Sequence, residues 1–513
     1  MSISHFRMNL VMCAICAVVA YAAAAMSSHG TVSAAPGTPV QRGGLYHVVV
    51  SCAANADPAW RAVADALAAK YSRAPFASSV VVADPSGARA ALRADDAAKA
   101  PRYVAFVVKP EEAGAKTVSA LHAAMKSLDD DPYYDAVWGI VTGPTAESAM
   151  RLALAKPVRP RTALTTTGVD FTPYDSATTI SDAYAPGSRR EEYALPNRPV
   201  AIVEKRPGAP QATRIMRGDT TAEFATAWDE LDPEFLATSS HASQRNLEMP
   251  FSTGNIVPRG GGLMTLPDAR LIDYSTGQAE ADAAARAASV RLATPKRDKV
   301  WIAAGNCLIG DYADNDSMAA ALIGYGRVVQ FMGYVKTTWF GEIGWETLAQ
   351  FSERVATASE AWYFAGQNLE RKLACTPQDS VNYKGRMWDR DGTAFWGDPA
   401  LDARLESGRA PQNARLTARR DGADIVLTLT ALADMQAAED KVEDVHVVHP
   451  FGIVLPRAVG TYACECPQGM SIVAGDDFAL VTSWPDMKRG ESISARLRVP
   501  GKNTVLALKG AGE

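Results

Sequence analysis

A histidine and a cysteine each follow a short hydrophobic segment that is typical of a buried strand. His241 comes after residues 235–240, and Cys307 comes after residues 301–306. A thiol is a poor nucleophile until it loses its proton, because its pKa is about 8.5, and a neighbouring imidazole can take that proton. Such a pair can attack a carbonyl carbon and return the proton to the leaving group. We therefore take Cys307 as the candidate nucleophile and His241 as its candidate general base.

The residues beside the pair would complete such a site. We expect backbone N–H groups at Ala242 and Asn306 to hold an oxyanion, a contribution of about 3 kcal/mol per donor. Glu204 ends an earlier hydrophobic segment and is expected to be an exposed surface carboxylate, with orientation of the imidazole as the alternative. The alternative for the pair itself is a buried structural cysteine and an ordinary loop histidine.

The segments around the pair alternate between short hydrophobic strands and amphipathic helices. Strands are expected at 47–50, 79–82, 103–108, 136–141, 199–203, 235–238, 300–304 and 328–332. Helices are expected at 60–71, 118–128, 146–155, 221–231 and 316–325, with one long helix over 341–373. Continuous apolar strands between helices indicate an α/β fold with a mostly parallel sheet covered on both faces. Ligands collect at the carboxyl ends of such strands, so His241 and Cys307 would face one crevice.

Composition divides the chain further. Residues 45–160 and 199–405 are expected to be two α/β subdomains, and residues 161–198 a linker or long surface connection. The polar, glycine-containing insertion between His241 and Lys299 is expected to form a loop layer over a site. Residues 406–513 contain short alternating strands separated by turn residues, which predicts an all-β, Ig-like sandwich.

The N-terminus has the order of a secretory signal peptide. His5 and Arg7 precede an apolar run from Leu10 to Ala25 that ends in small residues, so residues 1–25 are expected to be removed and 26–44 to be a flexible leader. The alternatives are an uncleaved anchor, which would be the chain's only membrane contact, and a lipoprotein cysteine at Cys13 or Cys16. The protein is thus expected to be secreted or otherwise outside the cytoplasm, in a periplasm or at a cell surface.

Charge and cysteine content set further limits. The net charge is −5 and the pI about 5.9, and no concentrated basic stripe is present, so nucleic acid is excluded as a partner. Beyond the signal peptide five cysteines are left. In an oxidising compartment an odd number means that at least one thiol is free or pairs with another chain.

Two groups of residues suggest metals, and we expect neither to be a cofactor site. Asp311, Asp314 and Asp316 would hold calcium only with further oxygen ligands, and capping of the next helix is the simpler interpretation. A structural calcium ion stays open as the alternative. A zinc interpretation draws on four residues without the usual Cys-x2-Cys spacing: His446, His449, Cys464 and Cys466. A disulfide or buried thiols are the expected state of those cysteines.

Several segments together resemble the gingipain-type peptidases, relatives of caspases and legumain. The matching segments are 129–134, 138–143, 145–147, 239–243, 304–307, 330–339 and 395–401. The resemblance covers residues 45–402 and the β-sandwich that follows. It implies a caspase-like fold and a secreted cysteine endopeptidase that cleaves proteins or peptides through a thioester acyl-enzyme.

The same resemblance assigns Trp339 to the substrate pocket, with ordinary packing beside Phe340 and Trp345 as the alternative. The family usually has glycine where Ala242 stands. An alanine N–H still donates, but the conformational freedom of glycine is lost. A catalytically inactive, secreted or surface-attached binding module is therefore the alternative function. A transpeptidase, which resolves the acyl-enzyme with an amine, is a third.

Overall fold

The computed structural model describes residues 38–499 except 41, 94–99, 183–198, 251–253, 269, 274–277, 281–285, 410–411, 441, 443–448 and 459. The expected signal peptide and most of the expected leader lie outside these residues. None of the helices in the described part has the length and apolar character needed to span a bilayer.

The described residues form a 12-stranded central sheet in an α/β fold. Its strands lie in the order β3, β2, β4, β5, β19, β18, β17, β10, β6, β7, β8, β9. Their bounds are Gly44–Val50 (β2), Phe76–Val82 (β3), Tyr103–Val107 (β4), Val137–Val141 (β5), Thr162–Thr165 (β6), Ser176–Asp182 (β7), Val200–Lys205 (β8), Ala212–Met216 (β9), Phe235–Thr238 (β10), Lys299–Ala303 (β17), Val328–Tyr334 (β18) and Thr393–Gly397 (β19). The central strands β4, β5, β17 and β18 are buried along their whole length, as expected for a sheet covered on both faces.

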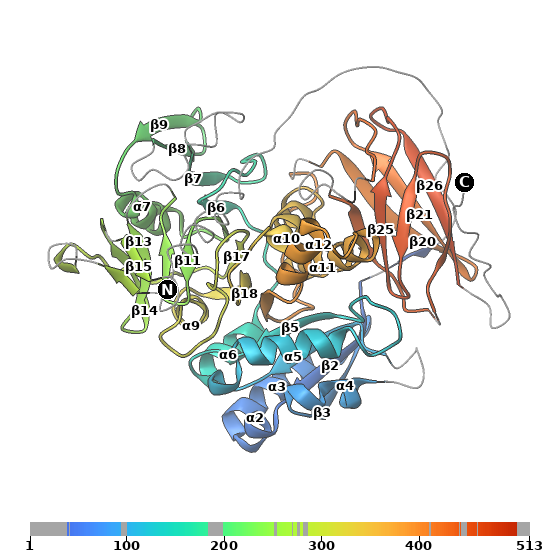
Figure 1. Cartoon of the computed structure of the whole chain (residues 1–513), viewed down its shortest axis with the longest axis horizontal. Coiled ribbons are helices and arrows are strands. Elements are labelled where there is room, and N and C mark those ends of the chain that lie inside the picture. Colours follow the sequence, from blue (N-terminus) through green and yellow to red (C-terminus); the bar gives the residue numbers. More distant parts are fainter. Residues whose placement is uncertain are drawn as a thin grey trace.

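Two parallel halves make up this sheet and run in opposite directions. Strands β3, β2, β4, β5 and β19 are mutually parallel, as are β18, β17, β10, β6 and β7. The halves join at the antiparallel pair β18–β19, and β8 and β9 add an antiparallel edge. Figure 1 shows β2, β3 and β5 of the first half in blue to cyan, and β17 and β18 of the second half in yellow-green. The carboxyl ends of β10 and β17 therefore lie at the same edge.

Several of the helices begin at a Ser, Thr or Asp whose side chain accepts a backbone N–H of the first turn. Their bounds are Cys52–Ala56 (α2), Pro58–Lys70 (α3), Ala88–Leu92 (α4), Ala115–Met125 (α5), Ala146–Leu154 (α6), Thr221–Leu231 (α7), Met318–Gly324 (α9), Glu342–Ser352 (α10), Ala358–Cys375 (α11) and Val381–Asp389 (α12). The single long helix expected over 341–373 is wrong, because the segment forms α10 and α11. Val355 between them has a left-handed φ of 57°, and Thr357 starts α11 with a capping box that includes Glu360.

Two segments expected to be irregular contain strands in their described parts. The connection 161–198 contains β6 and β7, whose threonine-rich sequences suit a strand. The insertion after His241 contains a small antiparallel sheet formed by β11 (Ala242–Ser243), β12 (Asn246–Glu248), β13 (Asn255–Arg259) and β14 (Gly262–Leu266). Its apolar side chains, including Leu247 and Ile256, join the main hydrophobic core. The insertion is therefore a packed layer.

The C-terminal part consists of two antiparallel sheets. One contains β20 (Ala414–Asp421), β21 (Asp424–Ala431), β23 (Ala463–Glu465) and β26 (Ser492–Arg498), and the other β22 (Phe451–Val454), β24 (Ser471–Ala474) and β25 (Phe478–Ser483). Leu429 of the first sheet and Val481 of the second share one hydrophobic cluster, so the sheets pack together. An Ig-like topology stays a prediction. Thr38–Pro39 (β1), within the expected leader, pairs with Arg419 and Arg420 as a further strand.

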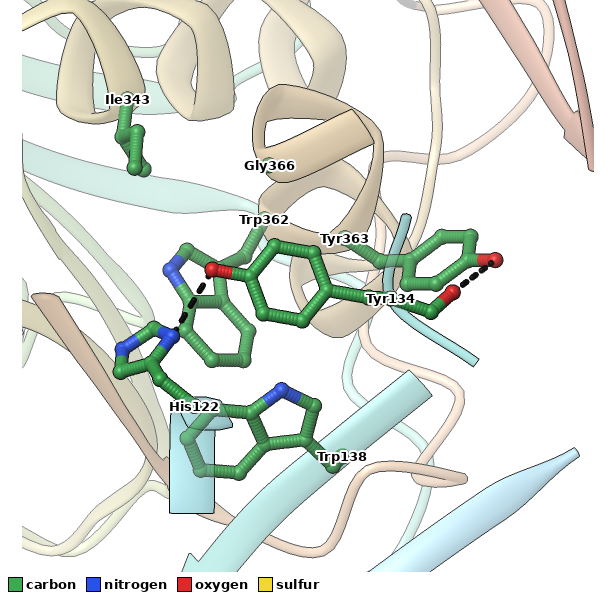
Figure 2. A pocket seen from close by; sticks show the side chains of 7 residues that line it. All are labelled: His122, Tyr134, Trp138, Ile343, Trp362, Tyr363 and Gly366. Carbon is green, nitrogen blue, oxygen red and sulfur yellow. Dashed lines mark hydrogen bonds between the residues drawn. The ribbon is translucent and has the colours of Figure 1, made fainter. Parts of the chain in front are cut away.

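A small aromatic cavity lies in the core between α5 and α11. Figure 2 shows His122 and Tyr134 among the side chains that line it, joined by a 2.9 Å hydrogen bond. The cavity measures about 10 Å³, the space of about one water molecule, so it cannot receive a substrate. Burial lowers the pKa of His122 to about 4, which keeps this histidine neutral inside the core.

Candidate active site

Strands β10 and β17 are hydrogen-bonded neighbours in the parallel half of the sheet. Thr238 at the end of β10 pairs with Ala303 at the end of β17, and the pairing continues for one residue through Ala304 N–H to the Thr238 carbonyl, at 2.9 Å. Both strands therefore end at the same level. The segments that carry His241 and Cys307 leave the sheet side by side.

A buried asparagine then ties these two segments together. The Asn306 side-chain amide donates to the Ser240 carbonyl at 2.9 Å and to its hydroxyl at 3.1 Å. The Asn306 side-chain oxygen accepts from the Thr238 hydroxyl at 2.6 Å. Asn306 directly precedes Cys307 and Ser240 directly precedes His241, so the two candidate residues each lie one residue beyond this contact.

Close packing requires the glycine at position 305. A Cβ atom there would lie 2.4 Å from the Ser239 hydroxyl. Gly344 of α10 is restricted in the same way, since a Cβ atom on it would lie 2.1 Å from the Ala304 carbonyl oxygen. The small residues around the pair, such as Ser239 and Gly305, thus allow two loops and a helix to approach one another.

Cys307 lies in a tight turn at the end of β17. Leu308 has a left-handed φ of 59°, and Gly310 packs against Gly333 so closely that no side chain fits. The Cys307 sulfur is partly buried and accepts the backbone N–H of Thr338 at 3.4 Å. A backbone donor at a sulfur favours the thiolate over the thiol.

His241 is also partly buried, at the start of the β11–β12 hairpin. Its carbonyl accepts the N–H of Glu248 at 3.0 Å, which fixes its backbone. Burial lowers the pKa of His241 below the ordinary 6.5. A neutral imidazole is the form that can accept a proton, so the position suits a general base at neutral pH.

Ala242 and Asn306, the expected oxyanion donors, are both buried. Ala242 pairs with Leu247 in the hairpin, and the Asn306 side chain makes the contacts described above. Their backbone roles toward a substrate remain predictions.

The alternative role of Glu204, orientation of the His241 imidazole, is wrong for a topological reason. It lies on β8, separated from β10 by β6 and β7. It pairs with Thr178 near the start of β7, and β7 runs parallel to β10, so Glu204 is level with the beginning of β10 while His241 follows its end. Its carboxylate instead pairs with Arg206 at 3.1 Å.

Glu248 is a site residue that the sequence analysis missed. The Ala242–Leu247 pair and the Glu248–His241 hydrogen bond place it directly opposite His241. Opposed residues in an antiparallel pair have side chains on the same face, with Cβ atoms about 4.5–5.5 Å apart. Burial raises the pKa of Glu248 to about 7, and within the described residues its carboxylate has no hydrogen-bond or ion-pair partner. Only the hairpin register could have revealed it.

Trp339 lies one residue after Thr338, and therefore beside the Cys307 segment. It is partly buried, and its ring centroid is 5.6 Å from that of Phe340. This position is compatible with both interpretations, a pocket wall and ordinary packing.

The aspartates after Cys307 do not converge on one point. Asp311 accepts from the Ala115 N–H and the Gln244 amide, and Asp314 forms an ion pair with Arg245. Ser317 caps the following helix α9, so the expected aspartate cap is wrong. Among the described residues, one acidic group has oxygens within 4.8 Å of one another: Asp129, Asp131 and Asp476. It lies far along the chain from the candidate pair, and Arg457 pairs with Asp476 at 3.3 Å.

The described residues among the four possible zinc ligands make other contacts or are free thiols, so the structure gives little support to a zinc site. His449 Nδ1 lies 2.7 Å from the Glu346 carboxylate, and His446 is outside the described residues. Cys464 and Cys466 are free thiols, as are Cys52 and Cys375.

A second cavity, of about 290 Å³, lies beside α7. Its lining includes Thr221, Asp229 and Arg291, but neither His241 nor Cys307. The case for the site therefore rests on the strand ends and their contacts.

No family model matches the chain, and no curated protein matches it. One solved structure, described as "Structure of Protease", is similar to it with a TM-score of 0.41 and 11% sequence identity. That similarity covers 89% of this chain and 95% of the other.

Proposed function

We propose that this chain is a cysteine endopeptidase in which Cys307 is the nucleophile and His241 the general base. The single observation that carries the proposal is the parallel pairing of β10 with β17, whose ends are joined by the Ser240–Asn306 hydrogen bond. Ser240 and Asn306 directly precede His241 and Cys307, so the two side chains follow the same contact. The resemblance to gingipain-type peptidases supports this assignment, and we propose a protein or peptide as the substrate.

The reaction follows from the two side chains. His241 takes the thiol proton, the Cys307 sulfur attacks the carbonyl carbon of the scissile bond, and the oxyanion that forms is held by backbone N–H groups, of which Ala242 and Asn306 are the candidates. The C–N bond then breaks as His241 returns its proton to the leaving amine, which leaves a thioester on Cys307. Water, deprotonated by His241, hydrolyses the thioester and regenerates the thiol.

The site of action is proposed to be outside the cytoplasm, because residues 1–25 have the composition of a signal peptide. The proposed reaction needs no metal or organic cofactor.

The test is selective alkylation of Cys307 by iodoacetamide, followed peptide by peptide with mass spectrometry. Exposed Cys52 in the same protein serves as the internal reference thiol. We expect Cys307 to react at least about tenfold faster than Cys52 at pH 6.5, and His241→Ala to remove this advantage. Hydrolysis of a peptide library should be lost in Cys307→Ala, whose fold is preserved.

Equal rates for Cys307 and Cys52, unchanged by His241→Ala, would contradict the proposal. Together with binding of a peptide without its cleavage, that result would favour the inactive binding module. Transfer of the acyl group to an added amine in preference to water would identify a transpeptidase.

A further inference from the structure

The loop between β18 and α10 runs along the Cys307 segment. Gly310 N–H donates to the Tyr334 carbonyl at 2.8 Å, and Leu308 N–H to the Lys336 carbonyl at 3.2 Å. In the opposite direction, Thr338 N–H points to the Cys307 sulfur at 3.4 Å. The distance between that donor and the sulfur therefore depends on how residues 335–341 are held.

The end of α12 holds this loop. The carboxylate of Asp389, the last residue of α12, is fully buried and accepts three consecutive backbone N–H groups, from Trp339 and Phe340 at 3.0 Å each and from Gly341 at 2.7 Å. The neighbouring Trp388 donates its indole N–H to the Thr337 carbonyl at 2.7 Å. Two successive residues of α12 thus fix the backbone on both sides of Thr338.

Three donors that converge on one side chain require a group that only accepts. A carboxylate does so with two oxygens, whereas an amide would turn an NH₂ group toward at least one N–H. Asp389 also serves as a cap for α10, because Gly341 at its N-cap position has no side chain to do so. A loss of stability alone on substitution would therefore be explained by helix capping.

We propose that Asp389 is a positioning residue that holds the Thr338 N–H against the Cys307 sulfur and so favours the thiolate. This inference rests on the proposed function, because only a nucleophilic Cys307 has a use for the thiolate. What it states is the protonation state of the Cys307 sulfur, which can be measured without any assay of peptide hydrolysis. The hydrogen bond from Thr338 N–H to a Cys307 thiolate is charge-assisted and therefore strong. Loss of the Thr338 donor should therefore reduce the thiolate fraction at neutral pH about tenfold.

The test measures the rate of Cys307 alkylation against pH in wild type, Asp389→Asn and Trp388→Phe. Asp389→Asn is expected to move the midpoint of the profile upward by about one pH unit. Trp388→Phe keeps an aromatic ring at an exposed position and removes only the indole donor, so it should fold normally and produce a smaller shift in the same direction. Asp389→Glu, which restores the carboxylate, should recover part of the shift.

The matched control is Asp398→Asn. Asp398 is also a fully buried carboxylate that accepts several bonds, from Tyr46, Tyr71 and Lys70, but it lies at the end of β19 in the other half of the sheet. Its replacement should lower stability and leave the midpoint for Cys307 unchanged. An Asp389→Asn protein that is folded and destabilised but keeps the wild-type midpoint would overturn the inference, as would a midpoint unmoved in Trp388→Phe when Asp389→Asn does not fold.

These outcomes separate the inference from the proposed function. A shift in Asp389→Asn together with no effect of His241→Ala would keep the positioning role and reject the peptidase. A clear effect of His241→Ala with no shift in Asp389→Asn and Trp388→Phe would keep the proposed peptidase and reject the positioning role of Asp389.

Discussion

His241 and Glu248 stand opposite each other at the open end of the β11–β12 hairpin, and burial changes the pKa of both. It lowers the pKa of His241 and raises that of Glu248 to about 7, so each side chain tends toward its neutral form. A neutral imidazole beside a neutral carboxyl needs less solvation than two charges would. The hairpin can therefore keep a polar pair at a partly buried site.

The raised pKa of Glu248 predicts that this residue lowers the stability of the folded protein at alkaline pH, where its buried carboxylate is charged. Its pKa in the folded state, about 7, is above the ordinary 4.5, so the folded protein binds a proton in this interval that the unfolded chain has lost. The favourable contribution is full below pH 4.5 and is lost as the pH rises through about 7. A glutamine side chain cannot ionise, so Glu248→Gln should be stabilised relative to wild type at high pH. The free energy of unfolding of Glu248→Gln minus that of wild type should be about 1–3 kcal/mol larger at pH 8 than at pH 4.

Urea unfolding of both proteins at the two pH values measures that difference. The control is Glu204→Gln, which removes a partly buried glutamate paired with Arg206 and should show no gain at pH 8. A Glu248→Gln protein whose stability follows wild type at both pH values would contradict the raised pKa.

At the scale of the elements, α10, α11 and α12 meet at a buried carboxylate. Glu342, in the first turn of α10, accepts Lys372 of α11 on one oxygen and Arg386 of α12 on the other. Arg386 is fully buried and also donates to the Thr376 hydroxyl and the Val442 carbonyl. The Glu342 carboxylate thus forms ion pairs with two buried cations, and these contacts hold α12, the helix that carries Asp389, against α10 and α11.

Glu342→Gln should therefore cost about 3 kcal/mol or more of unfolding free energy, because each of the two buried cations loses an ion-pair partner. Glu147→Gln is the matched control, since Glu147 occupies the first turn of α6 but is exposed, and its replacement should cost less than about 0.5 kcal/mol. Chemical denaturation of the two variants measures the contrast. Equal losses would mean that the buried cations do not depend on Glu342.

The elements also explain which candidate site residues could be proposed from the sequence. His241 and Cys307 could be, because each directly follows a hydrophobic strand and is surrounded by small residues, which is a local pattern. Glu204 failed as a partner because the order β10, β6, β7, β8 depends on long-range pairing. Asp389 reaches the site from α12, a helix that no pattern near Cys307 specifies.

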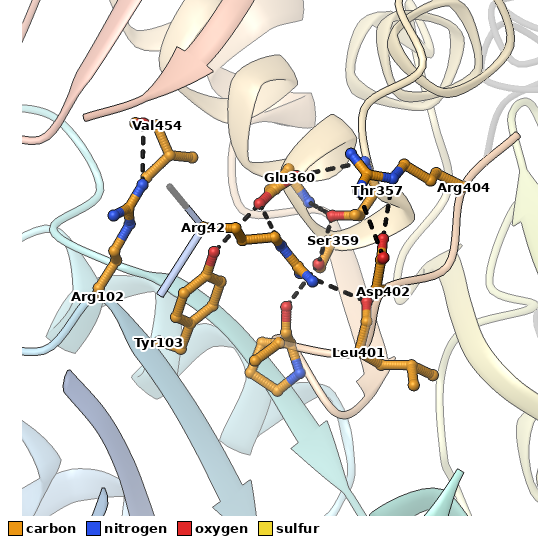
Figure 3. A network of polar contacts seen from close by, with 12 residues as sticks. Arg42, Arg102, Tyr103, Thr357, Ser359, Glu360, Leu401, Asp402, Arg404 and Val454 are labelled. Carbon is orange, nitrogen blue, oxygen red and sulfur yellow. Dashed lines mark hydrogen bonds and ion pairs between the residues drawn. The ribbon is translucent and has the colours of Figure 1, made fainter. Parts of the chain in front are cut away.

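At the scale of the whole molecule, the N-terminal segment joins the two antiparallel C-terminal sheets to the α/β layer. β1 pairs with β20, and three residues after β1 Arg42 reaches Glu360 of α11 at 2.9 Å (Figure 3). Tyr103 of β4 donates to the same carboxylate. Burial alone would raise the pKa of Glu360, but the Arg42 guanidinium lowers it to about 2. This ion pair should contribute stability above pH 4.5 that is lost as the pH falls toward 2.

A second connection is direct packing of the C-terminal sheets on α11. Val454, Phe478 and Leu480 belong to the same hydrophobic core as the central sheet, and Tyr363 of α11 donates to Asp477 at 2.6 Å. Gly452 of β22 lies flat on Phe364, so a Cβ atom there would be 2.4 Å from the ring. The C-terminal sheets are therefore an integral layer of the fold.

Gly452→Ala should separate β22 from α11 and cost about 1–3 kcal/mol, the usual cost of overpacking a core. Because the interface is shared, hydrogen exchange should increase in peptides on both sides of it, in α11 as well as in β22 and β25. Gly168→Ala is the control, since nothing lies within 4 Å of a Cβ atom at that glycine and exchange should stay as in wild type. Faster exchange confined to the C-terminal sheets would contradict the shared core and show that they open independently of the α/β layer.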